Sequence, residues 1–336
     1  MIRIGVIGCG EVARFGHLPA ITGNSDFVVV GLYDPDERNL VSTAQNFRLE
    51  PFDNLESLYK QGLDAVLIAS PAPTHRENVL IAALNGVHVL CEKPIANDSA
   101  EGREMADAMD RTGKIFTVGF CYRFSRVTAQ IKEWIDAGVI GKVRASRLTY
   151  IWNLHGRYEE HEGFWRESNR WKGRMQEGGP MVDCGVHAID LARYWLDSEA
   201  VTVSGHGAWI ADYEAPDHVW LHMDHANGAH TMVEMSFTYG HTVKDPIDHF
   251  SYHLIGEGGV IRYDRDGYVL EAKTGSGTLR VPGASEKNFE GMYAAFANAI
   301  KTGNASQLPT ANDGIIATEL AWNATKMAIA KRPTTQ

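Results

Sequence analysis

One stretch of the sequence combines residue types and spacing that suit acid–base chemistry. It runs from Gly178 to Asp190 and is typical of a Gly-Gly-Pro turn followed by a helix that continues to Leu196. Asp183 and His187 stand at i and i+4, which on an α-helix puts their Cβ atoms roughly 5–6 Å apart on the face that also carries Asp190. A carboxylate beside an imidazole can fix the tautomer of the ring and raise its basicity, as a general base for a hydroxyl requires. The competing interpretation is a solvated helix face with a chance Asp–His pair.

The whole chain has the length and composition of a two-domain globular protein. Its 336 residues suffice for two hydrophobic cores, and 44% of them are hydrophobic and 22% charged. The formal net charge of −10 argues against nucleic acid or an anionic membrane surface as the main partner. No apolar run approaches the ~18 residues of a membrane span. Because no signal-peptide core opens the sequence and the four cysteines lack CxxC spacing, we expect a cytoplasmic protein with reduced thiols.

The first residues predict a dinucleotide-binding loop. A short apolar strand, residues 2–7, leads directly into a G-x-G-x-x-A pattern formed by Gly8, Gly10 and Ala13. Gly8 permits a tight turn, Gly10 lets the backbone approach a pyrophosphate, and Ala13 allows a helix to pack closely on the strand. The positive end of that helix then faces the phosphates.

Asp34 is the second feature that indicates a dinucleotide. It ends a strand at residues 27–33, where an acidic side chain holds the hydroxyls of the adenosine ribose. Its charge would repel a 2′-phosphate, so the sequence favours NAD over NADP as the cofactor. Arg38 nearby keeps NADP open, since an arginine there could pair with that phosphate. The alternative is a plain Asp-Pro corner without a ligand.

Strands and helices then alternate through residue 119. Strands are expected at 64–70, 87–91 and 115–119, with helices at 75–84 and 99–111. Serial β–α units predict a parallel, doubly wound sheet for a first domain at residues 1–120, with the ligand beyond the carboxyl ends of the strands. The residues that we expect to contact the cofactor are Gly8, Cys9, Gly10, Glu11, Val12, Asp34, Ser70, Pro71, His75, Glu92 and Lys93.

Lys93 stands at the carboxyl end of a buried strand and is followed by a proline. This placement points its ammonium group toward the cofactor crevice, where it could hydrogen-bond a reacting hydroxyl and stabilise a developing alkoxide. The alternative is an ordinary surface lysine in a turn.

The remaining residues, 121–336, predict an α+β domain for substrate binding and oligomerisation. A helix at 125–137 is followed by a strand at 143–152, and later by seven strands between residues 201 and 281. Consecutive strands predict a large, mostly antiparallel open sheet with the helices at 125–137 and 181–196 on one face. We expect the other face to meet something apolar, which favours a homodimer or homotetramer through this sheet. Two last helices, 288–301 and 312–330, close the chain, and the last is expected to pack back on the first domain.

The segment between the strand at 143–152 and the Asp183 helix is expected to be a loop that binds substrate. Aromatic side chains and arginines suit a polyhydroxylated ring, although the arginines could instead mark a carboxylate or phosphate, and the aromatics could simply pack. The substrate-binding residues predicted here and in the motifs are Lys93, Trp152, His155, Trp165, Arg166, Asp183 and His187. The histidines between His206 and His253 show no HExxH or similar cluster, so we expect no metal.

Together these motifs resemble the Gfo/Idh/MocA oxidoreductase family, which includes glucose–fructose oxidoreductase and inositol dehydrogenases. The matching patterns are the glycine loop, Glu92-Lys93-Pro94, and the run from Gly178 through Asp183 and His187 to Asp190. The resemblance implies a catalytic set of Lys93, Asp183 and His187, and a cis peptide at Lys93-Pro94. It also places Arg123 near the nicotinamide and the substrate. Pro180 departs from the family pattern, in which many members have a third glycine.

What the resemblance implies is an NAD-dependent dehydrogenase for a secondary hydroxyl of a sugar, sugar derivative or cyclitol. His187 would take the hydroxyl proton, Asp183 would orient His187, and Lys93 would polarise the oxygen while hydride passes to the nicotinamide. A keto-sugar reductase is the same chemistry reversed. One alternative is an NAD-dependent glycosidase that oxidises its sugar transiently. Another is a non-catalytic dinucleotide-binding regulatory protein, which would be expected to lack the lysine or the histidine.

Overall fold

The computed structural model describes residues 1–152, 158–161, 164–238 and 248–332. The chain forms two compact units. The first comprises Met1–Phe124 and Lys287–Thr318, and the second comprises Ser125–Glu286 and Glu319–Gln336. The sequence pattern placed the division after residue 120. In the structure the first unit runs on to Phe124 and also takes in a segment from the C-terminal part of the chain.

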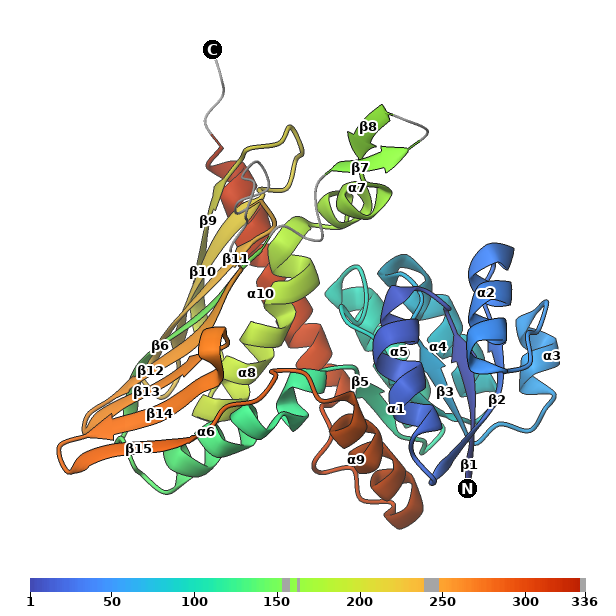
Figure 1. Ribbon diagram of the computed structural model, residues 1–336, viewed down its shortest axis with the longest axis horizontal. Helices are drawn as coiled ribbons and strands as arrows, with labels where there is room; N and C mark the ends of the chain where they lie inside the picture. Colours follow the sequence, from blue (N-terminus) through green and yellow to red (C-terminus); the bar gives the residue numbers. More distant parts are fainter. Residues whose placement is uncertain (153–157, 162–163, 239–247, 333–336) are drawn as a thin grey trace. The chain divides into compact units, whose positions relative to one another are not determined.

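The first unit is built on a parallel five-stranded sheet, as the sequence predicts (Figure 1). The strand order is β2-β1-β3-β4-β5, and every neighbouring pair is parallel. A single parallel bridge from Leu32 to Pro51 extends the sheet beyond β2. The order reverses at β1, which is the point where ligands bind in such sheets. The strands are β1 (Ile2–Ile7), β2 (Phe27–Tyr33), β3 (Ala65–Ile68), β4 (His88–Cys91) and β5 (Phe116–Val118).

Helices follow the strands of the first unit, and α2, α3, α5 and α9 begin at Asp or Asn side chains that cap them. The Asp36 side chain accepts hydrogen bonds from the amides of Arg38 and Asn39, and Asp98 does the same at the start of α5. Such caps satisfy amides that have no partner within the helix. The helices assigned to this unit are α1 (Leu18–Thr22), α2 (Glu37–Phe47), α3 (Leu55–Tyr59), α4 (His75–Leu84), α5 (Ser99–Asp110) and α9 (Phe289–Thr302).

The second unit is built on an eight-stranded sheet of order β15-β14-β13-β12-β6-β11-β10-β9. Only the β6–β11 pair is parallel, which confirms the expected mostly antiparallel sheet. The strands are β6 (Val143–Ile151), β9 (Ala200–Ala208), β10 (His218–His225), β11 (His230–Ser236), β12 (His249–Gly256), β13 (Gly259–Asp264), β14 (Val269–Thr274) and β15 (Gly277–Pro282).

Helices cover one face of this sheet, as Figure 1 shows. Helix α8 (Val186–Leu196) contacts β6 and β11, and α6 (Arg126–Asp136) contacts α8. Helix α10 (Ala311–Ala330) approaches β9 so closely that a Cβ at Gly205 would lie 2.1 Å from the carbonyl oxygen of Ala324. Nearly every side chain of α8 is buried.

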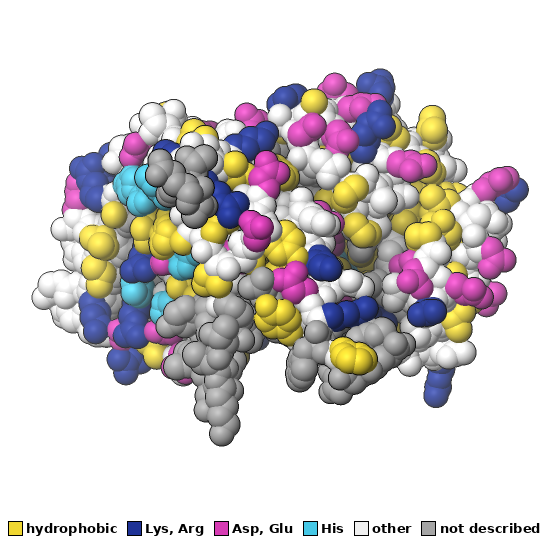
Figure 2. Space-filling view, turned by 90° about the horizontal axis from the view of Figure 1, so that it is seen from above, with side chains coloured by type: hydrophobic (Ala, Val, Ile, Leu, Met, Phe, Trp, Pro, Cys, Tyr) yellow, Lys and Arg dark blue, Asp and Glu magenta, His cyan; other side chains and the backbone are white. Residues whose placement is uncertain are grey.

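The opposite face of the sheet carries mostly polar and charged side chains, with apolar ones such as Ile255 and Val260 among them, whereas we expected an apolar face. Strand pairing places His253 between Arg147 and Arg262. Glu234 lies 2.6 Å from Arg147 and 3.2 Å from His218, and hydrogen bonds, chiefly from His218, lower its pKa to about 2. Figure 2 shows histidines among Lys and Arg side chains on this unit. An antiparallel sheet with one packed face alternates apolar and polar residues, and the sequence follows that rule.

The segment that was expected to be a loop contains regular structure. A two-stranded hairpin, β7 (Tyr158–His161) and β8 (Phe164–Glu167), precedes α7 (Asn169–Gln176). Trp171 and Met175 stand one helical turn apart on α7 and are buried with Ala215 and Phe237. The expectation of a plain loop was therefore wrong, because the spacing of these two apolar residues is that of a helix.

Buried and half-buried histidines make the stability of the protein depend on pH. Burial is the main cause that lowers the pKa of His75, His88 and His225 from the ordinary value of 6.5. Because the folded protein favours the neutral ring, this stability is complete above pH 6.5 and is lost as the pH falls through the lowered values.

We predict that the free energy of unfolding, measured with urea, decreases between about pH 7.5 and about pH 5.5. Carboxylates with a lowered pKa, such as Glu234, also destabilise the folded protein as the pH falls, but only below their ordinary pKa of 4.5. In His225→Asn the dependence on pH should be shallower than in the wild type. An equally steep dependence in both proteins would contradict this assignment.

Candidate functional site

The glycine loop lies at the carboxyl end of β1 and is shaped by backbone contacts. Gly8 has a φ of +97°, and a Cβ there would lie 2.5 Å from the amide nitrogen of Ser70. Only glycine allows the ends of β1 and β3 to meet in this way. At Gly10 a Cβ would meet no protein atom within 4 Å. Packing therefore does not require glycine at this position, whereas close approach of a ligand would.

Asp34 is held against this loop. Its Oδ2 accepts a hydrogen bond from the amide of Cys9 at 2.7 Å, and its Oδ1 accepts one from the amide of Asp36 at 2.8 Å. The carboxylate therefore lies beside the glycine turn, where the sequence predicted it. Burial, with help from the charge of Asp34, raises the pKa of the Cys9 thiol to about 12, so Cys9 is an unreactive thiol.

His75 links two loops at this edge of the sheet. Its Nε2 lies 2.8 Å from the carbonyl oxygen of Ser70, and its Nδ1 lies 3.0 Å from that of Pro94 and 3.2 Å from that of Ile95. The ring is buried, and both of its nitrogens face these carbonyls. His75 therefore ties the end of β3 to the segment after Lys93. A direct contact of this ring with the cofactor stays a prediction.

A buried carboxylate, Glu92, fixes the backbone that carries Lys93. Its Oε1 lies 2.9 Å from Nε2 of His17, and its Oε2 accepts the amide hydrogen of Lys93 at 3.1 Å. Because a carboxylate only accepts, Nε2 of His17 carries the proton. In its neutral form the ring then accepts at Nδ1 from the Tyr293 hydroxyl, 2.7 Å away. Removing one partner of a buried pair of this kind typically costs about 3–5 kcal/mol.

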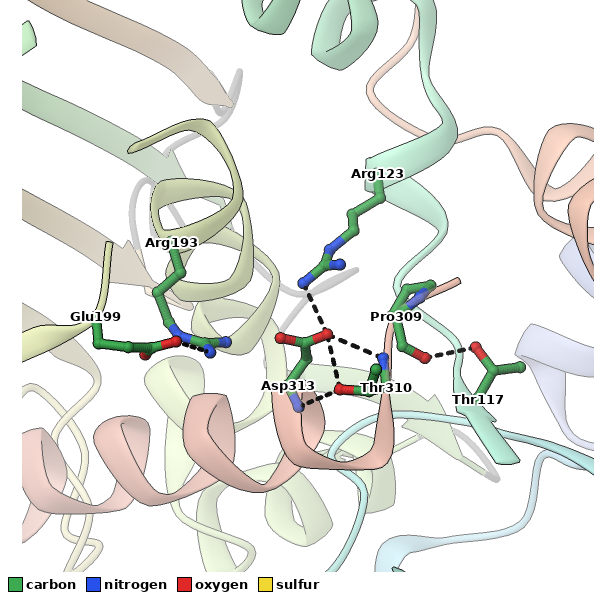
Figure 3. A network of polar contacts seen from close by, with 7 residues as sticks. All are labelled: Thr117, Arg123, Arg193, Glu199, Pro309, Thr310 and Asp313. Atoms are coloured by element: carbon green, nitrogen blue, oxygen red, sulfur yellow. Dashed lines mark hydrogen bonds and ion pairs between the residues drawn. The ribbon is translucent and has the colours of Figure 1, made fainter. Parts of the chain in front are cut away.

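The neighbours of Glu92 fit the same arrangement. A Cβ at Gly119 would lie 2.5 Å from Oε1 of Glu92, so this position must be glycine. The Lys93-Pro94 peptide is cis, which confirms the expectation from the resemblance. Arg123 follows β5 in a short 3₁₀ turn, Cys121–Phe124, and its Nη2 lies 3.3 Å from Oδ2 of Asp313 (Figure 3).

In the second unit, Gly178 and Gly179 form the turn before the helix motif. Their φ angles of +104° and +73° are in the left-handed region, which favours glycine. The next residues, Met181–Gly185, form a π-helical turn that continues into α8. Asp183 therefore lies on a wider turn than the α-helical spacing assumed. π-Helical turns are rare and occur often at functional sites.

Asp183 and His187 are both buried, with 8% and 7% of their surface exposed. This rules out the competing interpretation of a solvated helix face. Oδ1 of Asp183 lies 3.7 Å from Nε of Arg174, and the Cys184 thiol donates to its Oδ2 at 3.4 Å. Arg174 also lies 3.1 Å from Glu177. The Asp183 carboxylate is thus held by a cation and a thiol.

The expected substrate residues of the hairpin region are only partly described. Trp152 is half-buried and stacks on Tyr150, with ring centroids 5.0 Å apart. Arg166 is exposed on β8. His155 lies outside the described residues, and for Trp165 only the backbone is described.

No metal-binding cluster is found in the part of the chain that the structure describes. Within residues 1–152, 158–161, 164–238 and 248–332, no group of three or more His, Cys, Asp or Glu side chains could hold a metal ion. The expectation that the protein needs no metal stays a prediction.

Several supporting residues were not identified from the sequence. His17 and Tyr293 contact Glu92 or each other across long separations, and no local pattern marks them. Asp313 could have been noticed, because Thr310 and Asp313 have the spacing of a helix capping box. Arg174 was not identified as a site residue, because it lies in the segment that was expected to be a loop.

The residues present fit a dinucleotide. The glycine loop would bind the pyrophosphate, and Asp34 would bind the adenosine ribose. Lys93 and the Glu92 network lie at the carboxyl end of β4 in the same unit.

Comparisons with known proteins agree with this assignment. The profile described as "Oxidoreductase family, NAD-binding Rossmann fold" matches residues 2–120, and that of the GFO/IDH/MocA C-terminal domain matches residues 128–262. The scyllo-inositol 2-dehydrogenase (NAD(+)) of Bacillus subtilis (strain 168) is 30% identical, and the match covers 72% of this chain and 70% of that protein.

Two further relatives match almost the full length of the chain. The inositol 2-dehydrogenase of Rhizobium meliloti (strain 1021) is 27% identical, covering 98% of both chains. A levoglucosan dehydrogenase in complex with NADH and levoglucosan has the same fold, with a TM-score of 0.82 at 22% identity over 98% of this chain and 97% of that one. The chain therefore belongs to the Gfo/Idh/MocA family of oxidoreductases, and its first unit is an NAD-binding Rossmann domain.

Proposed function

We propose that this protein is an NAD-dependent dehydrogenase that oxidises a secondary hydroxyl of a sugar, sugar derivative or cyclitol. The observation that carries the proposal is the fixed position of Lys93. Its backbone is held by the buried Glu92 carboxylate at the carboxyl end of β4, in the unit that also has the glycine loop. Relatives named as inositol dehydrogenases support a cyclitol or sugar as the substrate.

The chemistry divides among three residues. Lys93 would hydrogen-bond the reacting oxygen and stabilise its developing negative charge. His187 would accept the hydroxyl proton, and Asp183 would orient the ring and stabilise the imidazolium that results. NAD, when bound, supplies the hydride acceptor. The burial of Asp183 and His187 supports these roles, because a dry site strengthens electrostatic effects.

We predict that Lys93→Met and His187→Ala each lower kcat by at least about 10²-fold. Binding of NADH, followed by its fluorescence, should persist in both variants, since neither change removes the glycine loop or Asp34. Lys60→Met is the matched control, because Lys60 is an exposed lysine of the same unit, where it pairs with the equally exposed Glu56. Near-normal turnover of either site variant would remove that residue from the catalytic set.

We further predict that Asp34 makes the protein select NAD over NADP. The wild type should bind NADH at least about tenfold more tightly than NADPH, since a carboxylate repels a 2′-phosphate. Asp34→Asn can still accept from the Cys9 amide but has no charge, so the ratio of the two dissociation constants should fall. Calorimetric titration measures both. An unchanged ratio would show that another residue sets the preference.

A substrate screen tests the reaction itself. Purified protein is given NAD together with free sugars, cyclitols, sugar acids and glycosides, and NADH absorbance and glycoside cleavage are followed in the same wells. The proposal expects NADH to form with a sugar or cyclitol and not in Lys93→Met. Glycoside cleavage that requires NAD but leaves no NADH would instead establish the glycosidase alternative.

We also propose that the protein is a homodimer or homotetramer. In this assembly a second copy covers the outer face of the eight-stranded sheet, which is the face opposite α8. The largely buried Glu234 and its pairing with Arg147 support this, because such polar side chains can form the hydrogen bonds of a subunit interface.

Sedimentation should accordingly give a mass larger than that of one chain. Arg147→Glu puts a second carboxylate beside Glu234 and should shift the protein toward monomer. Arg144→Glu, on the same strand but with the opposite side-chain direction, is the matched control. A monomeric wild type would contradict the proposal.

The cysteines and helices provide information about the cellular compartment of the protein. None of the four cysteines, all of which lie within the described residues, forms a disulfide, and burial raises the pKa of Cys91 as well as that of Cys9. These thiols support the proposal of a reducing cytoplasm. No helix among the described residues is long and apolar enough to span a membrane.

A further inference from the structure

Arg123 is held by a network that begins at β5 and ends at the start of α10, all within the first unit (Figure 3). Thr117 on β5 forms an antiparallel bridge with Thr310, and its hydroxyl donates to the carbonyl oxygen of Pro309 at 2.8 Å. These two contacts fix the residues before α10 against the sheet. The same strand leads, a few residues later, into the turn that carries Arg123.

Asp313 is oriented by the first turn of α10. Its amide donates to the hydroxyl of Thr310 at 3.1 Å, while its Oδ2 accepts from the amide and the hydroxyl of Thr310 at 2.9 and 3.0 Å. This is a capping box, and it leaves the carboxylate little rotational freedom. The oxygen that receives both bonds is also the one that lies 3.3 Å from Nη2 of Arg123.

The Arg123–Asp313 pair is largely shielded from water. The side chains are 13% and 19% exposed, so salt screens their attraction less than it would at the surface. Gly314, next to Asp313, has no room for a side chain, because a Cβ there would lie 2.8 Å from Val118 and 3.2 Å from Ile95. The start of α10 therefore packs closely against β5 and against the segment after Lys93.

We infer that Asp313 is a positioning and specificity-determining residue, which orients Arg123 and cancels its charge so that the site prefers an uncharged polyhydroxylated substrate to a phosphorylated or acidic one. This inference rests on the proposed function, which places Arg123 near the substrate. A guanidinium can donate to a sugar hydroxyl whatever the net charge around it. A carboxylate or phosphate must give up its hydration, and it needs an uncompensated cation in return.

The second unit supports the same conclusion independently. Arg174, beside the proposed catalytic carboxylate, also has acidic neighbours, with Glu177 at 3.1 Å and Asp183 at 3.7 Å. Its charge is thus already balanced by carboxylates of the protein. Arg123 and Arg174, one in each unit, therefore both have acidic partners.

The test compares matched substrates that differ in charge, such as myo-inositol with an inositol monophosphate, and glucose with glucuronate and glucose 6-phosphate. The measured quantity is the ratio of kcat/KM for the uncharged substrate to kcat/KM for the anionic one. The wild type should give a ratio above about ten. Asp313→Asn keeps an oxygen for the cap and removes the charge, and it should lower the ratio about tenfold.

Two variants separate specificity from general damage. Asp313→Glu keeps the charge and should keep the ratio near that of the wild type even if kcat falls. Glu104→Gln removes the acidic partner of Arg76 in the same unit and should change nothing. A purely structural role for Asp313 would lower turnover of both substrates alike and leave the ratio unchanged, which would overturn the inference.

The outcomes distinguish this inference from the proposed function. If the wild type oxidises no sugar or cyclitol, the proposed function fails. If it oxidises them but prefers the anionic member of each pair, the inference alone is wrong. Because this comparison uses the wild-type protein alone, it can contradict the inference even if Asp313→Asn does not fold.

Discussion

The buried carboxylate of Glu92 is the constraint on which the first unit depends. It joins three segments that are far apart in the chain: the π-helical turn after the glycine loop through His17, the backbone of Lys93, and α9 through the Tyr293–His17 contact. A carboxylate cannot be buried without such partners, so these contacts must form together for the unit to fold. The same requirement fixes Lys93 and excludes a side chain at Gly119. The stability of the fold and the position of the proposed catalytic residue therefore have one physical origin.

The two units use similar devices to place reactive groups. In each, glycines with positive φ angles make the turn, at Gly8 in one and at Gly178 and Gly179 in the other. In each, a π-helical turn follows, Ala13–His17 and Met181–Gly185. These turns carry His17 and Asp183, both buried polar residues. Departures from regular helix geometry thus coincide with the residues to which we assign supporting or catalytic roles.

The sequence predicted those parts of the protein that are encoded locally. The glycine loop, Lys93-Pro94 and the Gly178 turn are contiguous motifs, and the alternating β–α pattern predicted the parallel sheet. The partners of Glu92 and Arg123 were missed because they are distant in sequence; His17 and Glu92, for example, are 75 positions apart. The sequence analysis expected the second face of the large sheet to be apolar, because no helix was expected to cover it. The alternating residues of β11 and β12 indicate a polar face.

The most direct test of the central claim follows a single hydrogen. A ring-deuterated, uncharged cyclitol or sugar that serves as substrate is incubated with the wild-type protein and NAD, and the reduced cofactor is analysed by mass spectrometry. The account predicts one deuterium per NADH formed, one NADH per substrate oxidised, and neither product in Lys93→Met. Reduced cofactor without deuterium, or consumption of substrate without net NADH, would contradict the claim that this protein is a dehydrogenase.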